Sequence, residues 1–259
     1  MRYRRLVQLI DSHSHIDVEE FAGDRPDVLA RAREAGVTAQ IVPAISVAGW
    51  PALAELCTRE AGLHPAFGLH PMYLAEHRPE HLDELPKWLA RDGCVAVGEC
   101  GLDFYVEGLD AEAQRRYFAR QLELARDHDL PVVLHARRAV EEVIATLRRV
   151  GVASGVVHSF SGSAEQARQL FQLGFCIGLG GPITYERANR LRALVRDMPL
   201  EHLLLETDSP DQPTARHRGE RNEPARLVEV LRTVAELRGE DEGRIAEITT
   251  ANAKRLFGL

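Results

Sequence analysis

The chain has 259 residues, of which 45% are apolar and 27% are charged. This composition is that of an ordinary globular protein, and the length matches one barrel of eight strand–helix units, roughly 250 residues. The net charge of −7 and the sequence pI of about 5.9 argue against a broad basic face that grips duplex DNA. They do not exclude a nucleic-acid end that enters a pocket.

The chain carries no signal for disulfides, export or membrane insertion. Its four cysteines, at positions 57, 94, 100 and 176, form no CxxC pair, so reduced thiols are expected. The apolar stretch near the N-terminus is too short for a signal peptide, and no stretch approaches the ~20 apolar residues of a membrane span. We therefore expect a cytoplasmic monomer with no membrane partner.

Short apolar runs alternate with helical patterns eight times along the chain. Strands are expected near residues 6–15, 38–45, 64–69, 94–99, 131–135, 155–159, 175–180 and 203–207. Helices are expected near residues 26–35, 48–61, 79–91, 111–128, 138–149, 163–172, 186–197 and 223–238, with a ninth near 243–257.

This rhythm predicts an α/β protein, a single (β/α)8 TIM barrel that spans residues 1–259 as one domain. Units of similar length without a linker favour a closed barrel. The alternative is an open doubly wound sheet, which also gathers functional residues at the carboxyl ends of its strands.

Histidines and carboxylates stand at the carboxyl ends of five of these runs, LIDSHSH, VAVGECGLD, PVVLHA, GVVHSF and LLLETD. Since parallel strand ends converge on one mouth, six such groups would repel one another or be costly to desolvate without a cation. The pattern predicts a pair of divalent metal ions. The predicted ligands are His13, His15, Glu99, His135, His158 and Asp208.

Spacing suggests a role for several of these residues. His13 and His15 stand two apart, so in a strand both rings point to one face and can bind one ion. Glu99 is placed to bridge two ions. Asp208 can bind a metal and take a proton from a bound water. Glu206 shares the face of Asp208 and is predicted to act as a base or an orienting group, with buried structural pairing as the alternative.

Further candidates surround the predicted mouth. His70, in GLHP, is expected to hydrogen-bond a substrate oxygen, with a structural turn as the alternative, and Arg137 to pair with a phosphate. An arginine-rich loop after the eighth strand, which includes Arg221, is expected either to hold phosphate or to be solvated. The other histidines, His77 and His81 among them, are expected at the surface or in turns.

Two metal ions ~3.5–4 Å apart would lower the pKa of a bridging water and clamp a tetrahedral or phosphoryl oxygen. The expected chemistry is therefore hydrolysis by a metal-activated water, without a covalent enzyme intermediate. Histidine ligands favour Zn²⁺, Mn²⁺ or Ni²⁺, whereas phosphoryl chemistry often uses Mg²⁺.

The motifs DSHSHID, GLHP, VGECGLD, PVVLHARRA, VVHSFSGS, LLLETDSP, RNEP and TTANAKRLFGL, taken in this order, resemble the TatD family of metal-dependent hydrolases. GLGGPITYERA and ETDSPDQP are most similar to its YjjV-type branch. The resemblance covers nearly the whole chain and implies an amidohydrolase-like TIM barrel with a two-metal site.

The resemblance also implies how the ligands divide between the ions. His13, His15, Glu99 and Asp208 would hold one ion, and Glu99 with the histidines of strands five and six would hold the other. It implies phosphodiester hydrolysis of DNA or RNA, as a deoxyribonuclease or 3′-to-5′ exonuclease.

Two alternatives keep the same site. The first is a C–N or ester hydrolase that acts on a small metabolite, such as an amide, or on an aminoacyl end, because barrels of this type host many reactions. The second is a metal-stabilised binding module without turnover, which the intact ligand set disfavours.

Overall fold

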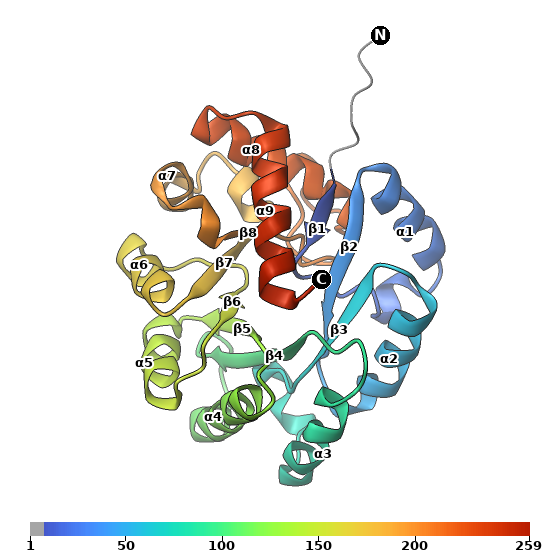
Figure 1. Ribbon diagram of the computed structural model, residues 1–259, viewed down its shortest axis with the longest axis vertical. Helices are drawn as coiled ribbons and strands as arrows, with labels where there is room; N and C mark the ends of the chain where they lie inside the picture. Colours follow the sequence, from blue (N-terminus) through green and yellow to red (C-terminus); the bar gives the residue numbers. More distant parts are fainter. Residues whose placement is uncertain (1–7) are drawn as a thin grey trace.

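The computed structural model describes residues 8–259 and contains eight parallel strands, each followed by a helix (Figure 1). Neighbouring strands pair in chain order from β1 to β8, and Ser12 N donates to Leu205 O at 3.0 Å, which joins the last strand to the first. The TIM barrel is confirmed and the open sheet is excluded. The strands are β1 Leu9–Asp11, β2 Val37–Pro43, β3 Leu63–Phe67, β4 Ala96–Asp103, β5 Val132–Arg137, β6 Gly155–Val157, β7 Phe175–Leu179 and β8 Leu203–Leu205.

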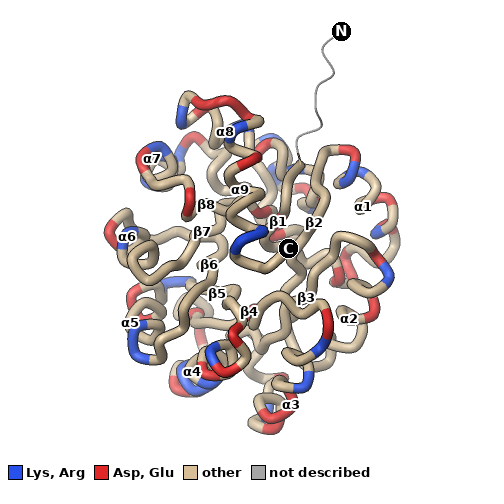
Figure 2. Tube along the Cα trace, in the orientation of Figure 1, with Lys and Arg blue, Asp and Glu red and all other residues tan. Residues whose placement is uncertain are grey.

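The helices form an outer ring, and the side chains before them fix where several begin. Asp110 accepts hydrogen bonds from the N–H groups of Glu112 and Ala113, and Ser163 forms a capping box with Gln166. Figure 2 shows acidic and basic positions intermixed on this ring. The helices are α1 Arg25–Glu34, α2 Trp50–Arg59, α3 Pro79–Leu89, α4 Ala111–Asp127, α5 Val140–Val150, α6 Ala164–Gln172, α7 Asn189–Asp197, α8 Leu227–Arg238 and α9 Glu242–Phe257.

The helix α9 crosses the barrel axis in Figure 1 and closes one end of the barrel. Ala253 and Phe257 of this helix pack with Ile10, Ile41 and Leu204 in an apolar cluster separate from the main core. Three other members of this cluster, Ala96, Val133 and Cys176, are the first or second residues of β4, β5 and β7. The floor is therefore filled with apolar side chains, and the carboxyl ends of the strands remain open for a site.

The largest differences from the expected strand boundaries are in the first and fourth strands. The first strand, predicted over residues 6–15, is observed as β1 Leu9–Asp11, so His13 and His15 follow the strand; residues 6 and 7 lie outside the described part of the chain. The fourth strand continues past Glu99 to Asp103, because it pairs with β5 through Gly101 and His135. Glu99 therefore lies inside a strand and not at its end.

None of the helices within residues 8–259 is both long and apolar enough to cross a membrane. The four cysteines, Cys57, Cys94, Cys100 and Cys176, are free thiols, as expected. Cys100, next to Glu99, points away from the barrel mouth into the main apolar core.

Candidate metal centre

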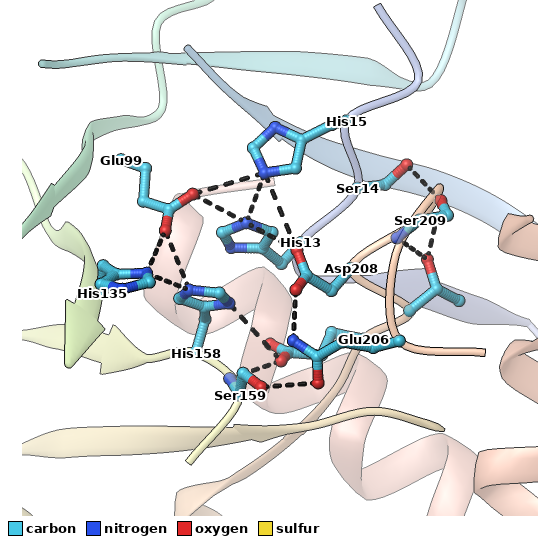
Figure 3. Close-up of polar contacts among 12 residues, drawn as sticks. His13, Ser14, His15, Glu99, His135, His158, Ser159, Glu206, Asp208 and Ser209 are labelled. Carbon is cyan, nitrogen blue, oxygen red and sulfur yellow. Dashed lines mark hydrogen bonds and ion pairs between the residues drawn. The ribbon is translucent and has the colours of Figure 1, made fainter. Parts of the chain in front are cut away.

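The side chains of Glu99, His13, His15 and Asp208, from three segments of the chain, meet at one point (Figure 3). His13 Nε2 lies 3.1 Å from Glu99 Oε2 and 3.5 Å from Asp208 Oδ1. His15 Nε2 lies 3.4 Å and 3.7 Å from the same two oxygens, and 3.1 Å from His13 Nε2. The end of β1, the middle of β4 and the segment after β8 thus bring two nitrogens and two oxygens together.

The second oxygen of Glu99 faces three imidazoles. Oε1 lies 2.9 Å from His70 Nε2, 3.0 Å from His135 Nδ1 and 2.9 Å from His158 Nε2. His135 Nδ1 and His158 Nε2 are 3.4 Å apart. Glu99, only 1% exposed, therefore separates two groups of donors and presents one oxygen to each.

The buried charges have strongly displaced ionisation equilibria. Burial alone would raise the pKa of Glu99, but the imidazoles of His70, His158 and His13 outweigh it and hold that pKa well below its usual range. Burial raises the pKa of the Asp208 carboxyl. Such opposed shifts within one buried cluster are typical of functional sites.

The donor set suits divalent cations. His13, His15 and Glu99 place donor atoms within 4.8 Å of one another, and so do His70, Glu99 and His135. His13 Nε2 and His15 Nε2 face each other and two carboxylate oxygens, an arrangement in which the lone pairs are best satisfied by a shared cation. Imidazole nitrogens and carboxylate oxygens are ligands that Zn²⁺, Mn²⁺ and Ni²⁺ accept.

Two side chains that sequence reasoning did not single out hold the donors in place. Asp103 Oδ2 lies 2.9 Å from His135 Nε2, on the side of the ring away from Glu99. Gln212 Nε2 donates to Asp208 Oδ2, and Ser159 Oγ donates to Gln212 Oε1 at 2.7 Å. The positions of Glu99 and Asp103 on one strand, four residues apart, were a usable signal for Asp103. Nothing local in the sequence indicates Gln212.

Asp11 joins the two chain segments that carry His13 and Asp208. Its carboxylate accepts hydrogen bonds from the backbone N–H of His13 and from both the N–H and the hydroxyl of Thr207. This fully buried carboxylate fixes the segment after β1 against the segment after β8.

Glu206 lies behind the cluster and is fully buried. Its Oε1 accepts from the backbone N–H of Ser159 and lies 3.8 Å from His158 Nδ1, and its Oε2 has no hydrogen-bond partner. Burial raises the pKa of Glu206 to about 8. The carboxylate fits only because residue 178 is glycine: a Cβ there would stand 2.0 Å from Glu206 Oε2.

A cavity of about 640 Å³ opens above the cluster, and His15, His70 and Asp208 line it. Arg137 also lines this cavity, where an anion would reach it. Arg221 does not, since both its terminal nitrogens bind Asp24, and the phosphate-holding alternative for this residue is not supported.

Two histidines expected at the surface are buried. His77 Nε2 donates to the carbonyl of His70 at 2.8 Å, and His81 is 3% exposed. Surface exposure was wrong for both, although His77 does lie in a turn, directly after the 3-10 helix Pro71–Glu76. Both rings bond to nearby backbone instead of water, His77 to the carbonyl of His70 and His81 to the N–H of Arg78.

Backbone strain is concentrated at the same end of the barrel. Among residues 8–259, five residues other than glycine have positive φ, and four of them follow β5, β6 or β8. Those four are Arg138 (φ 53°), Ser159 (φ 46°), Asp208 (φ 53°) and Gln212 (φ 50°). Strained backbone of this kind persists where the surrounding contacts hold it, most often at functional sites.

The fold and the site together define an amidohydrolase-like TIM barrel whose histidines and carboxylates can hold metal ions. The family model described as "TatD related DNase" matches residues 10–258. The chain belongs to the TatD family and is a metal-dependent hydrolase.

Named relatives agree with this assignment. The chain is 40% identical to the "uncharacterized metal-dependent hydrolase YjjV" of Escherichia coli K12, over 98% of this chain and 99% of the relative. The crystal structure of that TatD homologue covers the same shares and superposes with a TM-score of 0.95. The "putative deoxyribonuclease tatdn3" of Danio rerio is 34% identical over 96% of each chain.

Proposed function

We propose that this enzyme hydrolyses phosphodiester bonds at the ends of DNA or RNA strands. The observation that carries the proposal is the single buried carboxylate, Glu99, whose two oxygens each face a separate group of metal-binding donors. The family name and the name of the Danio rerio relative support a nuclease. The free thiols support a cytoplasmic location.

We assign the donors to two divalent cations. His13, His15, Glu99 Oε2 and Asp208 Oδ1 would hold one, and Glu99 Oε1 with His135 and His158 would hold the other. Cations bound there supply Lewis-acid chemistry, because they lower the pKa of water and neutralise charge on a phosphoryl oxygen. Zn²⁺, Mn²⁺, Ni²⁺ and Mg²⁺ are the candidates.

Side chains of the protein accept a proton, bind the substrate and orient the metal-binding residues. Asp208 is the assigned acceptor of the proton from the attacking water, and Gln212, which donates to its Oδ2, fixes the direction of the carboxylate. Both ring nitrogens of His70 are engaged, Nε2 with Glu99 Oε1 and Nδ1 as acceptor from the N–H of Met72, so of its two expected roles we assign the structural turn. Arg137, at the cavity wall, pairs with a phosphate. Glu206 does not line the cavity, so of its two expected roles we assign the orientation of His158 and not direct proton transfer.

The proposal is tested with metal-stripped enzyme given Mg²⁺, Mn²⁺, Zn²⁺ or Ni²⁺ and a panel of single-stranded oligonucleotides, bis(4-nitrophenyl) phosphate, esters and amides. Shortening of oligonucleotides by the wild-type enzyme supports it. Turnover of amides or esters, with no attack on phosphodiesters, would contradict it and favour the alternative hydrolase.

Substitutions in the cluster complete the test. Glu99→Ala and Asp208→Asn should lower kcat by roughly a thousandfold, the scale on which loss of an acid–base group acts. Asp127→Asn, at the exposed end of α4, is the control and should keep wild-type kcat. Full activity of the Asp208→Asn enzyme would refute the assigned role.

A further inference from the structure

Most of the exposed large apolar side chains of residues 8–259 lie at the mouth of the barrel. Among residues 8–259 four are exposed, Met72, Tyr73, Tyr105 and Leu259. Met72 and Tyr73 follow β3 and line the cavity, and Tyr105 follows β4 at the same end of the barrel. Exposed aromatic rings beside a catalytic cavity are what single-stranded nucleic acids use for stacking.

Tyr105 holds two guanidinium groups at one side of this mouth. Arg137 Cζ lies 3.7 Å and Arg138 Cζ 4.7 Å from the centre of its ring. Within residues 8–259 neither arginine has a carboxylate at ion-pair distance, so both remain available to an anion. The backbone N–H of Tyr105 donates to Asp103, the residue behind His135. This Tyr105–Arg137–Arg138 cluster is therefore anchored to the metal centre.

The opposite side of the mouth is acidic. Glu20, which follows β1, and Asp211, which follows β8, line the cavity beside Tyr73. Burial and the nearby charges of Glu76, Asp211 and Glu20 raise the pKa of the Tyr73 hydroxyl. In an eight-stranded barrel β1 stands opposite β5, which carries Arg137. The ring of Tyr73 packs edge-on against His70, with 5.6 Å between centroids.

We propose that the mouth is divided into an anion-binding side, the Tyr105–Arg137–Arg138 cluster, and an acidic side around Tyr73, so that the enzyme prefers single strands whose attacked end carries no phosphate. This inference rests on the proposed nuclease function and specifies its substrate.

The two sides of the mouth match the positions of the phosphates along a bound nucleic-acid strand. With the scissile phosphate at the metal centre, the rest of the strand places its next phosphate on the side of the two guanidinium groups. The terminal nucleoside falls on the other side, where its base packs against Tyr73. A phosphate on that nucleoside would meet the carboxylates of Glu20 and Asp211, and like charges repel there.

The first arm of the test compares matched oligonucleotides that end in a hydroxyl or a phosphate at the 3′ or the 5′ end. A phosphate at the attacked end should lower kcat/KM by roughly tenfold, and a phosphate at the other end should have little effect. In the double variant Glu20→Gln/Asp211→Asn, the ratio of kcat/KM for hydroxyl-ended to kcat/KM for phosphate-ended oligonucleotides should fall towards one. If the wild-type enzyme cleaves phosphate-ended and hydroxyl-ended oligonucleotides with equal kcat/KM, the role proposed for the acidic side is overturned.

The second arm tests the cationic side with Arg138→Gln and Tyr105→Leu. Both should raise KM for oligonucleotides severalfold, and Arg138→Gln should reduce the salt slope of log kcat/KM by about 0.7, one phosphate contact on a single strand. Arg91→Gln is the matched control, because Arg91 also stacks on an aromatic ring, that of the partly buried Trp88, but away from the mouth.

The outcomes separate the two proposals. Cleavage of oligonucleotides with the same KM and salt slope in Arg138→Gln, Tyr105→Leu and Arg91→Gln would overturn the divided mouth and leave the nuclease intact. A wild-type enzyme that cleaves no oligonucleotide but hydrolyses other compounds in the panel would overturn both. Metal content and melting temperature of each variant show that the site is still assembled.

Discussion

Asp103 stands behind His135: its Oδ2 is 2.9 Å from Nε2 of the imidazole, while Nδ1 of the same ring faces Glu99 Oε1 at 3.0 Å. A carboxylate in this position fixes the tautomer and direction of a metal-binding ring and makes it a stronger ligand. The other oxygen of Asp103 accepts from the N–H groups of Tyr105 and Val106, so one side chain supports both the ring and the following turn.

We therefore predict that Asp103→Asn weakens metal binding by roughly 10- to 100-fold. The amide keeps an oxygen for the turn but removes the negative charge behind His135. Titration of stripped enzyme with Zn²⁺ or Mn²⁺ measures the effect. Asp127→Asn serves as the exposed control, and equal metal affinity in both variants would contradict the orienting role.

Gln212 is predicted to set the direction of Asp208. With Gln212→Leu the carboxylate loses the donor to Oδ2, and we expect kcat to fall roughly tenfold or more while KM changes little. Gln169→Leu, at a half-buried position on the outer side of α6, is the matched control, because Gln169 Nε2 also donates to a carboxylate, that of Glu165. A variant that loses substrate affinity but keeps kcat would show that Gln212 contacts substrate instead.

Removal of the metal should reduce stability as well as activity. A ligand that binds only the folded state stabilises it by about 2.7 kcal/mol at one hundred times its Kd, which for a chain of this size corresponds to roughly 5–10 °C in melting temperature. Scanning calorimetry with and without chelator measures this shift. An unchanged melting temperature in protein shown to have lost its metal would argue against a buried cation site.

Gly178→Ala should destabilise the protein, because its Cβ would stand 2.0 Å from Glu206 Oε2 inside a packed region. Overpacking of this kind costs about 1–3 kcal/mol of unfolding free energy, measurable by urea titration. Gly23→Ala is the control, since a Cβ at that position meets nothing within 4 Å. Equal stability of the two variants would mean that Glu206 moves aside at little cost.

The sequence was sufficient for the barrel and for the convergence of the six candidate ligands at one mouth, because both depend on local patterns: apolar runs followed by a histidine or an acid. It was insufficient where long-range pairing decides the outcome. The continuation of β4 past Glu99 depends on its ladder with β5. Gln212 matters through Ser159, 53 residues earlier, and the burial of His77 depends on a returning 3-10 segment.

The floor of the barrel gives a further prediction about stability. Phe257 is 4% exposed and packs with Ala253 against strand residues. Phe257→Ala should lower the unfolding free energy by about 3–5 kcal/mol. Leu259→Ala, at a 38% exposed position, should change it by less than about 0.5 kcal/mol. Similar losses in both variants would show that α9 is not an essential part of the core.

The position of α9 also bears on how the protein is made. Translation proceeds from the N-terminus, so every strand has been synthesised before the helix that seals them. Until then α9 does not shield Ile10, Ile41 and Leu204 from solvent. The nascent barrel therefore exposes apolar side chains that chaperones and neighbouring chains can bind. Completion of the fold therefore waits for a contact between the beginning of the described chain and its last helix, a slow step because the two are so far apart in sequence.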